Sequence, residues 1–352
     1  MLWWPVLALI SAALSGLLIT WHIPAGVLVG CMVAGAVLSS RDVELSVPLP
    51  LFTVAQGVIG CLMAKNLLLS TLLRVAHDWP TFLVATVSLV AASAGLGWIL
   101  MRRQVMPGST AVWGLAPGGA SAMVLMSEAY GADVRLVAFM QYSRVLLVTV
   151  VASLVAWWWS PSNGSAKALD WWAVPHVADL GWTLLLGVAG PALARWLAIP
   201  AGPMLLPMLL GAALQAMGWL VIELPQPLLA ASYAVIGWSI GLRFTRAVLM
   251  HAWRAMPQVF GAIGILMGFG LVMAVVLTMW SGFDPFTAYL ATSPGGADSV
   301  AIIAATAAVD AGFVMAMQMV RLLMVIVTGP RISRFVSSLK STHQKRNGPG
   351  GR

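Results

Sequence analysis

The chain has 352 residues, of which 60% are hydrophobic and only 9% are charged, and its formal net charge is +8. A water-soluble chain of this length would carry far more Lys, Arg, Asp and Glu, so the composition excludes a soluble globular fold. Apolar runs repeatedly reach the roughly 18 to 20 residues that an α-helix needs to cross a bilayer core. The sequence therefore predicts an all-α polytopic membrane protein whose main partner is the lipid bilayer.

Apolar segments in chain order predict the helices. The first half carries them near 5–21, 25–40, 50–68, 80–101, 110–129 and 134–159, and the second near 176–197, 201–219, 227–243, 257–279, 287–306 and 311–329. The first segment lacks a basic leader and a cleavage pattern, which favours a retained span over a signal peptide. The fifth segment of each half is broken by Pro-Gly-Gly. Irregular backbone at membrane depth is tolerated only where protein buries it or where it lines a cavity, so both segments are expected to be re-entrant or discontinuous.

The two halves are copies of one repeat. Matching residues lie 177 positions apart: the Pro-Gly-Gly tripeptides at 117–119 and 294–296, and the pairs Asp133 and Asp310, Gln141 and Gln318, Arg144 and Arg321. Nine of the 28 positions from the prolines to the arginines are identical, where such a composition gives about two by chance. The repeats are predicted to span 1–168 and 169–336, followed by a basic, disordered cytoplasmic tail at 337–352.

Charge placement predicts how the copies are oriented. If the broken segments are re-entrant, each half has five full spans, an odd number, and the second repeat is inverted relative to the first. With the tail inside, the cytoplasmic side then holds most basic residues, as the positive-inside rule requires: Arg41, Arg102, Arg103, Arg195, Arg243, Arg246, Arg254, Arg331 and Arg334, against Lys65, Arg74 and Lys167 outside. The alternative of six spans per half separates Arg102 and Arg103 from the Arg243 cluster. The prediction is two inverted repeats of five transmembrane helices plus one re-entrant segment each, in a bacterial cytoplasmic (inner) membrane, with the C-terminus cytoplasmic.

The Pro-Gly-Gly breaks are candidate ligand sites. Proline ends a hydrogen-bond ladder, and glycine lets the backbone turn sharply and come close to a ligand. Inverted repeats whose broken helices meet near the midplane are typical of secondary transporters. The alternative is a tight packing kink between helices. Recurrence of the break in both halves, followed by Ser121 in one and Asp298 in the other, favours a site.

Arg144 and Arg321 are predicted to lie near mid-depth in the last span of their repeats, where an uncompensated arginine costs at least about 2.5 kcal/mol. Gln141 and Gln318 share a helical face with them, since each lies three residues earlier. A guanidinium beside an amide suits bidentate binding of a carboxylate or phosphonate. A structural role is the alternative: each arginine satisfies free carbonyls of the facing break, or pairs with Asp298.

Asp298 breaks the symmetry of the repeat, because its mate is Ser121. It is either a proton or cation carrier or the fixed counter-ion of Arg321, and the sequence leaves both alternatives open. The predicted substrate- and ion-binding set is Pro117, Gly118, Gly119, Ser121, Gln141, Arg144, Ser293, Pro294, Gly295, Gly296, Asp298, Gln318 and Arg321. Asp133 and Asp310 are instead expected to cap the helices that follow them.

Enzyme classes are disfavoured by the sequence. The five histidines fall in loops, span ends or the tail, and none forms a His-x-x-x-His or His-carboxylate pair on one helix face, so a metal site is not expected. No Gly-x-Gly-x-x-Gly cofactor loop stands between a strand and a helix, and no phosphate-binding loop is found. We therefore expect neither catalytic residues nor a cofactor.

Three stretches carry a family resemblance: GADVRLVAFMQYSRVL, ATSPGGADSVAIIAA and IELPQPLLAASYAVIGWSIGL. They resemble the AbrB family of bacterial integral membrane proteins, which shares only its name with a soluble DNA-binding regulator, and the resemblance covers almost all of the chain. It implies a fold similar to the cation-proton antiporter and anion transporter superfamily. It also implies two functional labels, regulation of gene expression and ammonia monooxygenase. The second conflicts with the missing metal ligands. The first has no DNA-binding element behind it, so we expect no direct nucleic-acid binding.

The sequence thus predicts a secondary transporter, an exchanger or symporter, of a small anionic or zwitterionic solute, coupled to H⁺ or Na⁺. The alternative is a membrane-embedded solute sensor that acts indirectly on gene expression. An ammonia monooxygenase-like oxidase is less favoured. The oligomeric state stays open, with a homodimer as one alternative.

Overall fold

The computed structural model describes residues 3–67, 71, 73, 76–103, 106, 109–118, 120–159, 176–199 and 201–346. Throughout these ranges the regular elements are helices. The first repeat comprises α1 (Trp3–Thr20), α2 (Gly26–Ser39), α3 (Leu49–Asn66), α5 (Trp79–Arg102), α6 (Thr110–Leu115), α7 (Ala120–Ala129) and α8 (Val134–Trp159). The second comprises α9 (Val177–Trp196), α10 (Gly202–Ala216), α11 (Gln226–Gly241), α12 (Arg246–Ala252), α13 (Met256–Ser281), α14 (Pro285–Thr292), α15 (Ala297–Thr306) and α16 (Ala311–Arg346). The predicted all-α fold is confirmed.

Helix length and composition fit a polytopic membrane protein. Within the described ranges, six stretches are long and apolar enough to cross a bilayer: α1, α5, α8, α9, the continuous 246–281 of α12 and α13, and 311–328 of α16. Helices α2, α3, α10 and α11 are shorter or more polar, and close to half or more of their residues are buried. Protein rather than lipid surrounds much of their surface. These four helices can therefore be shorter or more polar than the outer helices.

The duplication recurs in the turns that precede α2 and α10. His22 and Ala25 have φ angles of 56° each, and their repeat mates Ala198 and Ala201 have φ angles of 51° and 54°. A left-handed conformation is uncommon for residues other than glycine. Its recurrence at two matched positions shows that the copies share backbone conformation as well as sequence.

The two broken segments are re-entrant hairpins, because each begins and ends at the same place. The backbone N–H of Asp133 donates to Thr110 Oγ1 over 3.0 Å, which joins the end of the first segment to its start. The mates repeat the contact in the second segment, where the N–H of Asp310 donates to Thr287 Oγ1 over 3.2 Å. A chain that returns to its entry point does not cross the membrane, so each repeat keeps five crossings.

Helix directions confirm the inversion independently. Gly60 of α3 packs on α10, where an added Cβ would fall 2.5 Å from the Met204 carbonyl oxygen, and its mate Gly237 of α11 packs on α2, 2.6 Å from the Leu28 carbonyl oxygen. Farther along, Gly211 approaches Ala64, so α3 and α10 run in the same direction. The third helix of one repeat is parallel to the second helix of the other only if each repeat crosses the membrane an odd number of times.

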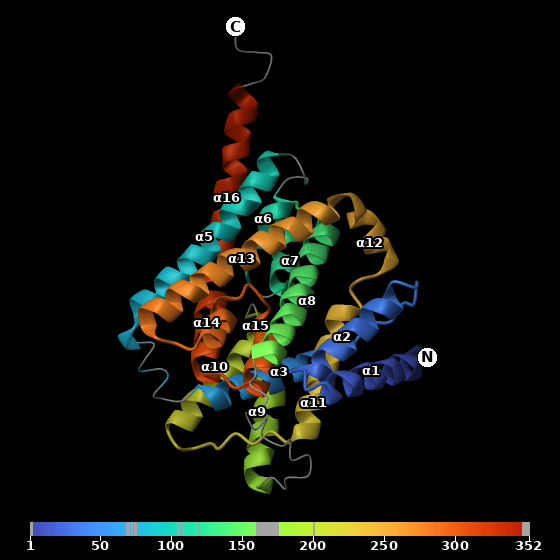
Figure 1. The fold of residues 1–352 in the computed structure, drawn as a ribbon, viewed down its shortest axis with the longest axis vertical. Helices are drawn as coiled ribbons and strands as arrows, with labels where there is room; N and C mark the ends of the chain where they lie inside the picture. Colours follow the sequence, from blue (N-terminus) through green and yellow to red (C-terminus); the bar gives the residue numbers. More distant parts are fainter. Residues whose placement is uncertain are drawn as a thin grey trace.

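The helices form two bundles. Helices α1–α3 and α9–α11 pack together as the scaffold bundle, and α5–α8 with α13–α16 pack as the hairpin bundle, while α12 joins them. Figure 1 shows α12, the end of α5 and the C-terminal part of α16 toward one end of the long axis, and the start of α9 toward the other. We call these the α12 end and the α9 end. Arg102 ends α5, Arg246 begins α12 and Arg254 follows in the next turn, so these basic residues belong to elements of the α12 end.

Two predicted boundaries lie at the margins of the described structure. The expected junction of the repeats, between residues 168 and 169, falls outside the described residues. The expected tail begins at 337, but α16 continues as a helix to Arg346. No Gly or Pro stands between Pro330 and Gly348, so the sequence holds no strong helix breaker over this stretch.

Candidate functional site

Each hairpin contains a break between two half-helices. In the first, α6 ends at Leu115 and α7 begins at Ala120; in the second, α14 ends at Thr292 and α15 begins at Ala297. The last carbonyls of α6 and α14 have no partner inside their own helix, and burial makes an unsatisfied carbonyl costly. The side chains that satisfy these carbonyls therefore define the site.

Arg144 of α8 closes the first break. Its Nη1 donates to the carbonyl oxygens of Leu115 and Ala116 over 3.1 and 2.8 Å, and its Nη2 lies 3.5 Å from that of Gly118. Nη2 also donates to Gln141 Oε1 over 2.8 Å, while Gln141 Nε2 donates to the Ala116 carbonyl over 3.0 Å. Both side chains are fully buried. The pair acts as a cap on the C-terminal end of α6, where a cation also suits the helix dipole.

Arg321 of α16 closes the second break in the same way. Its Nη1 donates to the Ser293 carbonyl, and its Nη2 donates to the Gly295 carbonyl over 2.7 Å and to Gln318 Oε1. Gln318 Nε2 donates to the Leu290 carbonyl over 2.9 Å. Of the two roles considered for the arginines, the structure shows the structural one: both guanidinium groups bind backbone carbonyls of the breaks.

The two breaks differ in how many other donors reach their carbonyls. The Leu115 carbonyl also accepts from Ser93 Oγ of α5 over 2.6 Å, and the Ala116 carbonyl also accepts from the Gly118 N–H over 2.8 Å. In the second break, the side-chain donor found for the Ser293 and Gly295 carbonyls, within the described part of the chain, is Arg321. The second break therefore depends more on its arginine.

The tip of each hairpin touches the last helix of the other repeat. A Cβ added to Gly118 would fall 2.9 Å from Val325 Cγ1, and a Cβ added to its mate Gly295 would fall 3.0 Å from Val148 Cγ1. Val325 and Val148 are themselves mates, one helical turn beyond Arg321 and Arg144. The glycines allow this close crossing, so the packing role considered for Pro-Gly-Gly is present and brings the two arginine caps together at the centre.

Asp298 lies in the first turn of α15, beside the second break. Its Oδ1 accepts the Ser299 N–H over 3.0 Å, and Ser299 Oγ donates to the Gly296 carbonyl over 3.1 Å. Among the described side chains, no acidic group forms an ion pair with Arg321 or Arg144. The counter-ion alternative for Asp298 is therefore not what this conformation shows. Its mate Ser121 has no described side chain, and Gly119 lies outside the described residues.

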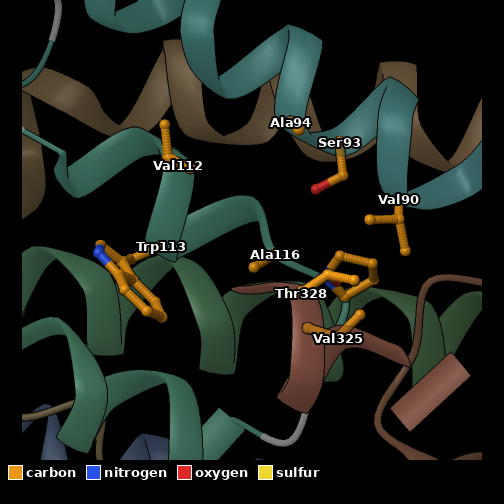
Figure 2. A pocket seen from close by; sticks show the side chains of 9 residues that line it. Val90, Ser93, Ala94, Val112, Trp113, Ala116, Val325 and Thr328 are labelled. Carbon is orange, nitrogen blue, oxygen red and sulfur yellow. The ribbon is translucent and has the colours of Figure 1, made fainter. Parts of the chain in front are cut away.

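A small apolar cavity adjoins the first break (Figure 2). Side chains from α5, α6 and α16 converge on it, including Val90, Trp113, Val325 and Thr328, with Ala116 and Pro117 of the break itself. Its volume is about 20 Å³, enough for roughly one water molecule. The cavity is too small for a solute.

The site's electrostatics are set by two buried cations. Arg144 is fully buried and Arg321 is 4% exposed, and the carbonyls that surround them are neutral. The N-terminal ends of α7 and α15 also face the breaks, and helix N-termini carry partial positive charge. The expectation of no His-carboxylate pair on one helix face is wrong, since His176 Nδ1 lies 3.2 Å from Asp179 Oδ2 at the start of α9. The described residues contain no group of three or more His, Cys, Asp and Glu that could hold a metal ion. The site thus holds two buried positive charges that no acidic side chain among the described residues pairs with.

A second charged contact lies at the α12 end. Asp133 caps α8 as predicted, since its Oδ1 accepts the N–H groups of Arg135 and Leu136 over 3.0 and 3.1 Å, and its Oδ2 lies 2.7 Å from His251 Nε2 of α12. Burial alone would raise the pKa of the Asp133 carboxyl, but the hydrogen bond and charge of His251, with the two backbone amides, hold the pKa below its ordinary value. The sequence did not predict this contact, because the two residues are far apart in the chain and no motif or regular spacing connects them.

These features define a class: an all-helical membrane protein of two inverted repeats, each with a re-entrant hairpin closed by a buried arginine. The chain belongs to the AbrB family, since the family model described as "Transition state regulatory protein AbrB" matches residues 27–337. It is 44% identical over 336 residues to "Putative regulator AbrB" of Escherichia coli (strain K12), covering 95% of this chain and 97% of that protein. It is 25% identical over 350 residues to "Uncharacterized protein YhjN" of Bacillus subtilis (strain 168), covering 93% and 90%.

Proposed function

We propose that the chain is a secondary transporter that carries a small anionic or zwitterionic solute across the cytoplasmic membrane. The observation that carries the proposal is the pair of inverted hairpins whose breaks meet beside two buried arginines without acidic partners. Broken segments from inverted repeats are how secondary transporters build a midplane site. An anion near these cations would offset a buried positive charge that costs several kcal/mol.

The bundles support alternating access. At the α9 end, Gly312 at the start of α16 lies against the end of α3, where an added Cβ would fall 2.7 Å from the Asn66 carbonyl oxygen. At the α12 end, a cavity of about 330 Å³ separates α8 and α13 of the hairpin bundle from α2 of the scaffold bundle. Tight contact at one end with an opening at the other is what one state of a rocking carrier requires. The positive-inside rule assigns the α12 end and the C-terminus to the cytoplasm.

Asp298 is the residue we propose for coupling to H⁺ or Na⁺. It lies in the first turn of α15 beside the second break, it has no cationic partner among the described side chains, and its mate in the other hairpin is a serine. A carboxylate that gains and loses a cation changes the charge of the site by one unit, which links cation binding to anion binding.

Reconstitution into proteoliposomes tests the transporter. We expect an imposed H⁺ or Na⁺ gradient to drive accumulation of an anionic solute, and Asp298→Asn to abolish accumulation while downhill exchange persists. Asp284→Asn is the matched control, because Asp284 caps α14 through the N–H groups of Phe286 and Thr287 and lies away from the break. Gradient-driven accumulation by the Asp298→Asn protein would refute the coupling role.

A membrane sensor is the second candidate, and the printed name of the Escherichia coli relative favours it. Tight solute binding without flux across a broad panel would support the sensor. The proposal treats the chain as a carrier rather than an enzyme. Stoichiometric bound metal together with oxygen-dependent turnover in the purified protein would support the oxidase alternative instead.

A further inference from the structure

The connection between the two bundles borders the cavity at the α12 end. Residues 242–255, which we call the strap, run from the end of α11 in the scaffold bundle to the start of α13 in the hairpin bundle and include α12. Phe244 and Leu249 of the strap line the cavity of about 330 Å³, together with side chains of α2 and α8. Figure 1 shows α12 next to the start of α8. Because the strap is covalently joined to both bundles, a movement of one bundle against the other must change its shape or its contacts.

The start of the strap is fastened to the scaffold bundle. Arg246 Nη1 donates to Asp42 Oδ2 over 2.8 Å, and Asp42 belongs to the loop that follows α2. Beside this ion pair, Thr245 Oγ1 accepts the Val248 N–H over 3.3 Å and caps α12. The ion pair is exposed and contributes little stability of its own. Together with the cap, however, it fixes where α12 begins.

Two contacts fasten the strap to α8 of the hairpin bundle. The guanidinium of Arg243 lies over the ring of Tyr142, 5.5 Å from the ring centroid, which is the geometry of a cation–π contact. At the other end of α12, His251 Nε2 lies 2.7 Å from Asp133 Oδ2. Because Asp133 is the cap of α8, His251 is tied to the first turn of that helix.

Of these three contacts, the one between His251 and Asp133 is the one whose charge changes near neutral pH. Histidine is the side chain whose charge ordinarily changes between pH 5 and 8. Burial acts to raise the pKa of the Asp133 carboxyl, but the hydrogen bond with His251 and the backbone amides of α8 hold that pKa below its ordinary value of 3.8, so the carboxylate stays ionised over this range. The other described charged side chains on the strap, on the helices packed against it and in the adjoining loops belong to residue types that ordinarily keep their charge between pH 5 and 8: Arg41, Asp42, Glu44, Glu128, Arg135, Arg144, Arg243, Arg246 and Arg254.

We propose that the strap is a pH-sensitive latch: with His251 charged it holds the two bundles at the observed separation, and loss of that charge lets the hairpin bundle move against the scaffold bundle. A charge-assisted hydrogen bond is roughly twice as strong as a neutral one, so deprotonation of His251 weakens the contact with Asp133. With the α12 end on the cytoplasmic side, the latch responds to cytoplasmic pH. The proposal rests on the movement of the bundles in the proposed function, and it adds a means of regulating that movement.

Distances between spin labels on the two bundles test the latch. The labels are placed on the full chain at Ser46→Cys in the loop after α2 and at Arg103→Cys at the end of α5, both exposed positions, with the buried native thiols removed by Cys31→Ala and Cys61→Ala. Double electron–electron resonance in nanodiscs then gives the distance distribution at pH 5.5 and at pH 8.5. Since the His251 contact is partly exposed, we expect a roughly two- to fivefold change in the ratio of two distance populations between these pH values. The same distribution at both pH values would overturn the proposal.

Variants of the contact locate the group that titrates. His251→Gln should show the pH 8.5 distribution at both pH values because it cannot gain the charge, whereas His251→Lys, which stays positive, should show the pH 5.5 distribution at both. Asp133→Asn keeps a helix cap and should also lose the pH response, which provides a second variant in case His251→Gln does not fold. His176→Gln is the matched control: His176 Nδ1 lies 3.2 Å from Asp179 Oδ2, but that pair lies within the first turn of α9 and joins no two helices. It should respond to pH as the wild type does.

The outcomes separate the latch from the proposed function, because the distance measurement needs neither a solute nor flux. A wild-type pH response that persists in His251→Gln or in Asp133→Asn would place the titrating group elsewhere and overturn the latch, even if gradient-driven flux of an anion is observed. The expected pH response, lost in these two variants and kept in His176→Gln, would support the latch even if no solute were transported.

Discussion

The unequal hydrogen bonding of the two breaks predicts that the matched arginines are not equally important for stability. Arg321→Met would leave the Ser293 and Gly295 carbonyls without the donor that the described structure gives them. Each orphaned buried carbonyl costs about 1 to 3 kcal/mol. Arg144→Met would leave the Leu115 carbonyl bound to Ser93 and the Ala116 carbonyl bound to Gln141.

Both substitutions remove a buried cation, and the relief of its desolvation is similar in the two proteins. The difference therefore reports the orphaned carbonyls, and we expect Arg321→Met to lower the free energy of unfolding by about 2 to 4 kcal/mol more than Arg144→Met does. Denaturation in mixed detergent micelles, followed by tryptophan fluorescence, measures it.

A double variant tests the reasoning rather than the rank order alone. Ser93→Ala combined with Arg144→Met removes both side-chain donors to the Leu115 carbonyl, so its cost should exceed the sum of the single costs by about 1 to 3 kcal/mol. Strict additivity, or a larger loss from Arg144→Met than from Arg321→Met, would show that the carbonyls do not determine the stability of the breaks.

Two further predictions concern the helix crossing and the α12 end. Gly60→Ala places a methyl group 2.5 Å from the Met204 carbonyl oxygen and should destabilise the protein by about 1 to 3 kcal/mol in the same denaturation assay, whereas Gly264→Ala, which meets open space, should be neutral. Asp133→Asn keeps a helix cap but loses the charge facing His251. Because the pKa of Asp133 is lowered by folding, its contribution is present above the ordinary value of 3.8 and is lost as pH falls through the lowered pKa. Since the pair is partly exposed, the variant should lose at most about 1 kcal/mol at pH 7. In thermal unfolding, this difference from wild type should persist down to the ordinary pKa of 3.8, shrink below it, and vanish once the pH is below the lowered pKa.

The control for the α12 end is Asp284→Asn, which removes a capping charge from α14 without an ion pair among the described residues. At pH 7 it should cost less stability than Asp133→Asn does, because, of the two aspartates, only Asp133 faces a histidine. Equal losses for the two variants at pH 7 would show that capping, and not His251, accounts for the effect.

Much of the fold could be predicted from the sequence because it is duplicated. The offset of 177 residues between matching positions located both breaks. The distribution of basic residues between the two sides of the membrane favoured an odd number of crossings per repeat, and the hairpin contacts of Thr110 and Thr287 agree with that number. Apart from α12, which was not predicted, and the end of α16, which lies 17 residues beyond the predicted 329, helix ends were predicted to within a few residues. Pro, Gly and polar residues interrupt the apolar runs at these ends. These are local signals, and local signals are what a single sequence states directly.

The site was predictable only in part. Gln141 and Arg144 were placed on one helical face from their spacing, but the partner of the guanidinium depends on which carbonyls the facing break leaves free, and that is a tertiary property. The cavity wall is harder still, since Val37, Phe139 and Phe260 come from three helices of both repeats. No spacing rule connects such residues, so the cavity was not foreseen.

The copies differ in how the carbonyls of their breaks are satisfied. In the first repeat Ser93 of α5 donates to the Leu115 carbonyl, whereas in the second the mate of Ser93 is Gly270, which has no side chain to donate. There the direction of the bond is reversed, and Thr292, the mate of Leu115, donates to the Gly270 carbonyl over 2.9 Å. This bond ties α14 to α13 but satisfies no carbonyl of the break.

The second hairpin is thus held at its break mainly by one cation, and it is also the hairpin that carries Asp298. A change of charge at Asp298 acts on a break whose geometry depends on Arg321, while the first break would keep its shape through Ser93 and Gln141. If only one hairpin changes conformation when the coupling cation binds, we expect it to be the second hairpin, which carries Asp298. Transplanting the carboxylate, with Ser121→Asp in an Asp298→Ser background, should then give a folded protein without gradient-driven accumulation. Full recovery of accumulation would show that the hairpins are interchangeable and that their unequal hydrogen bonding has no part in coupling.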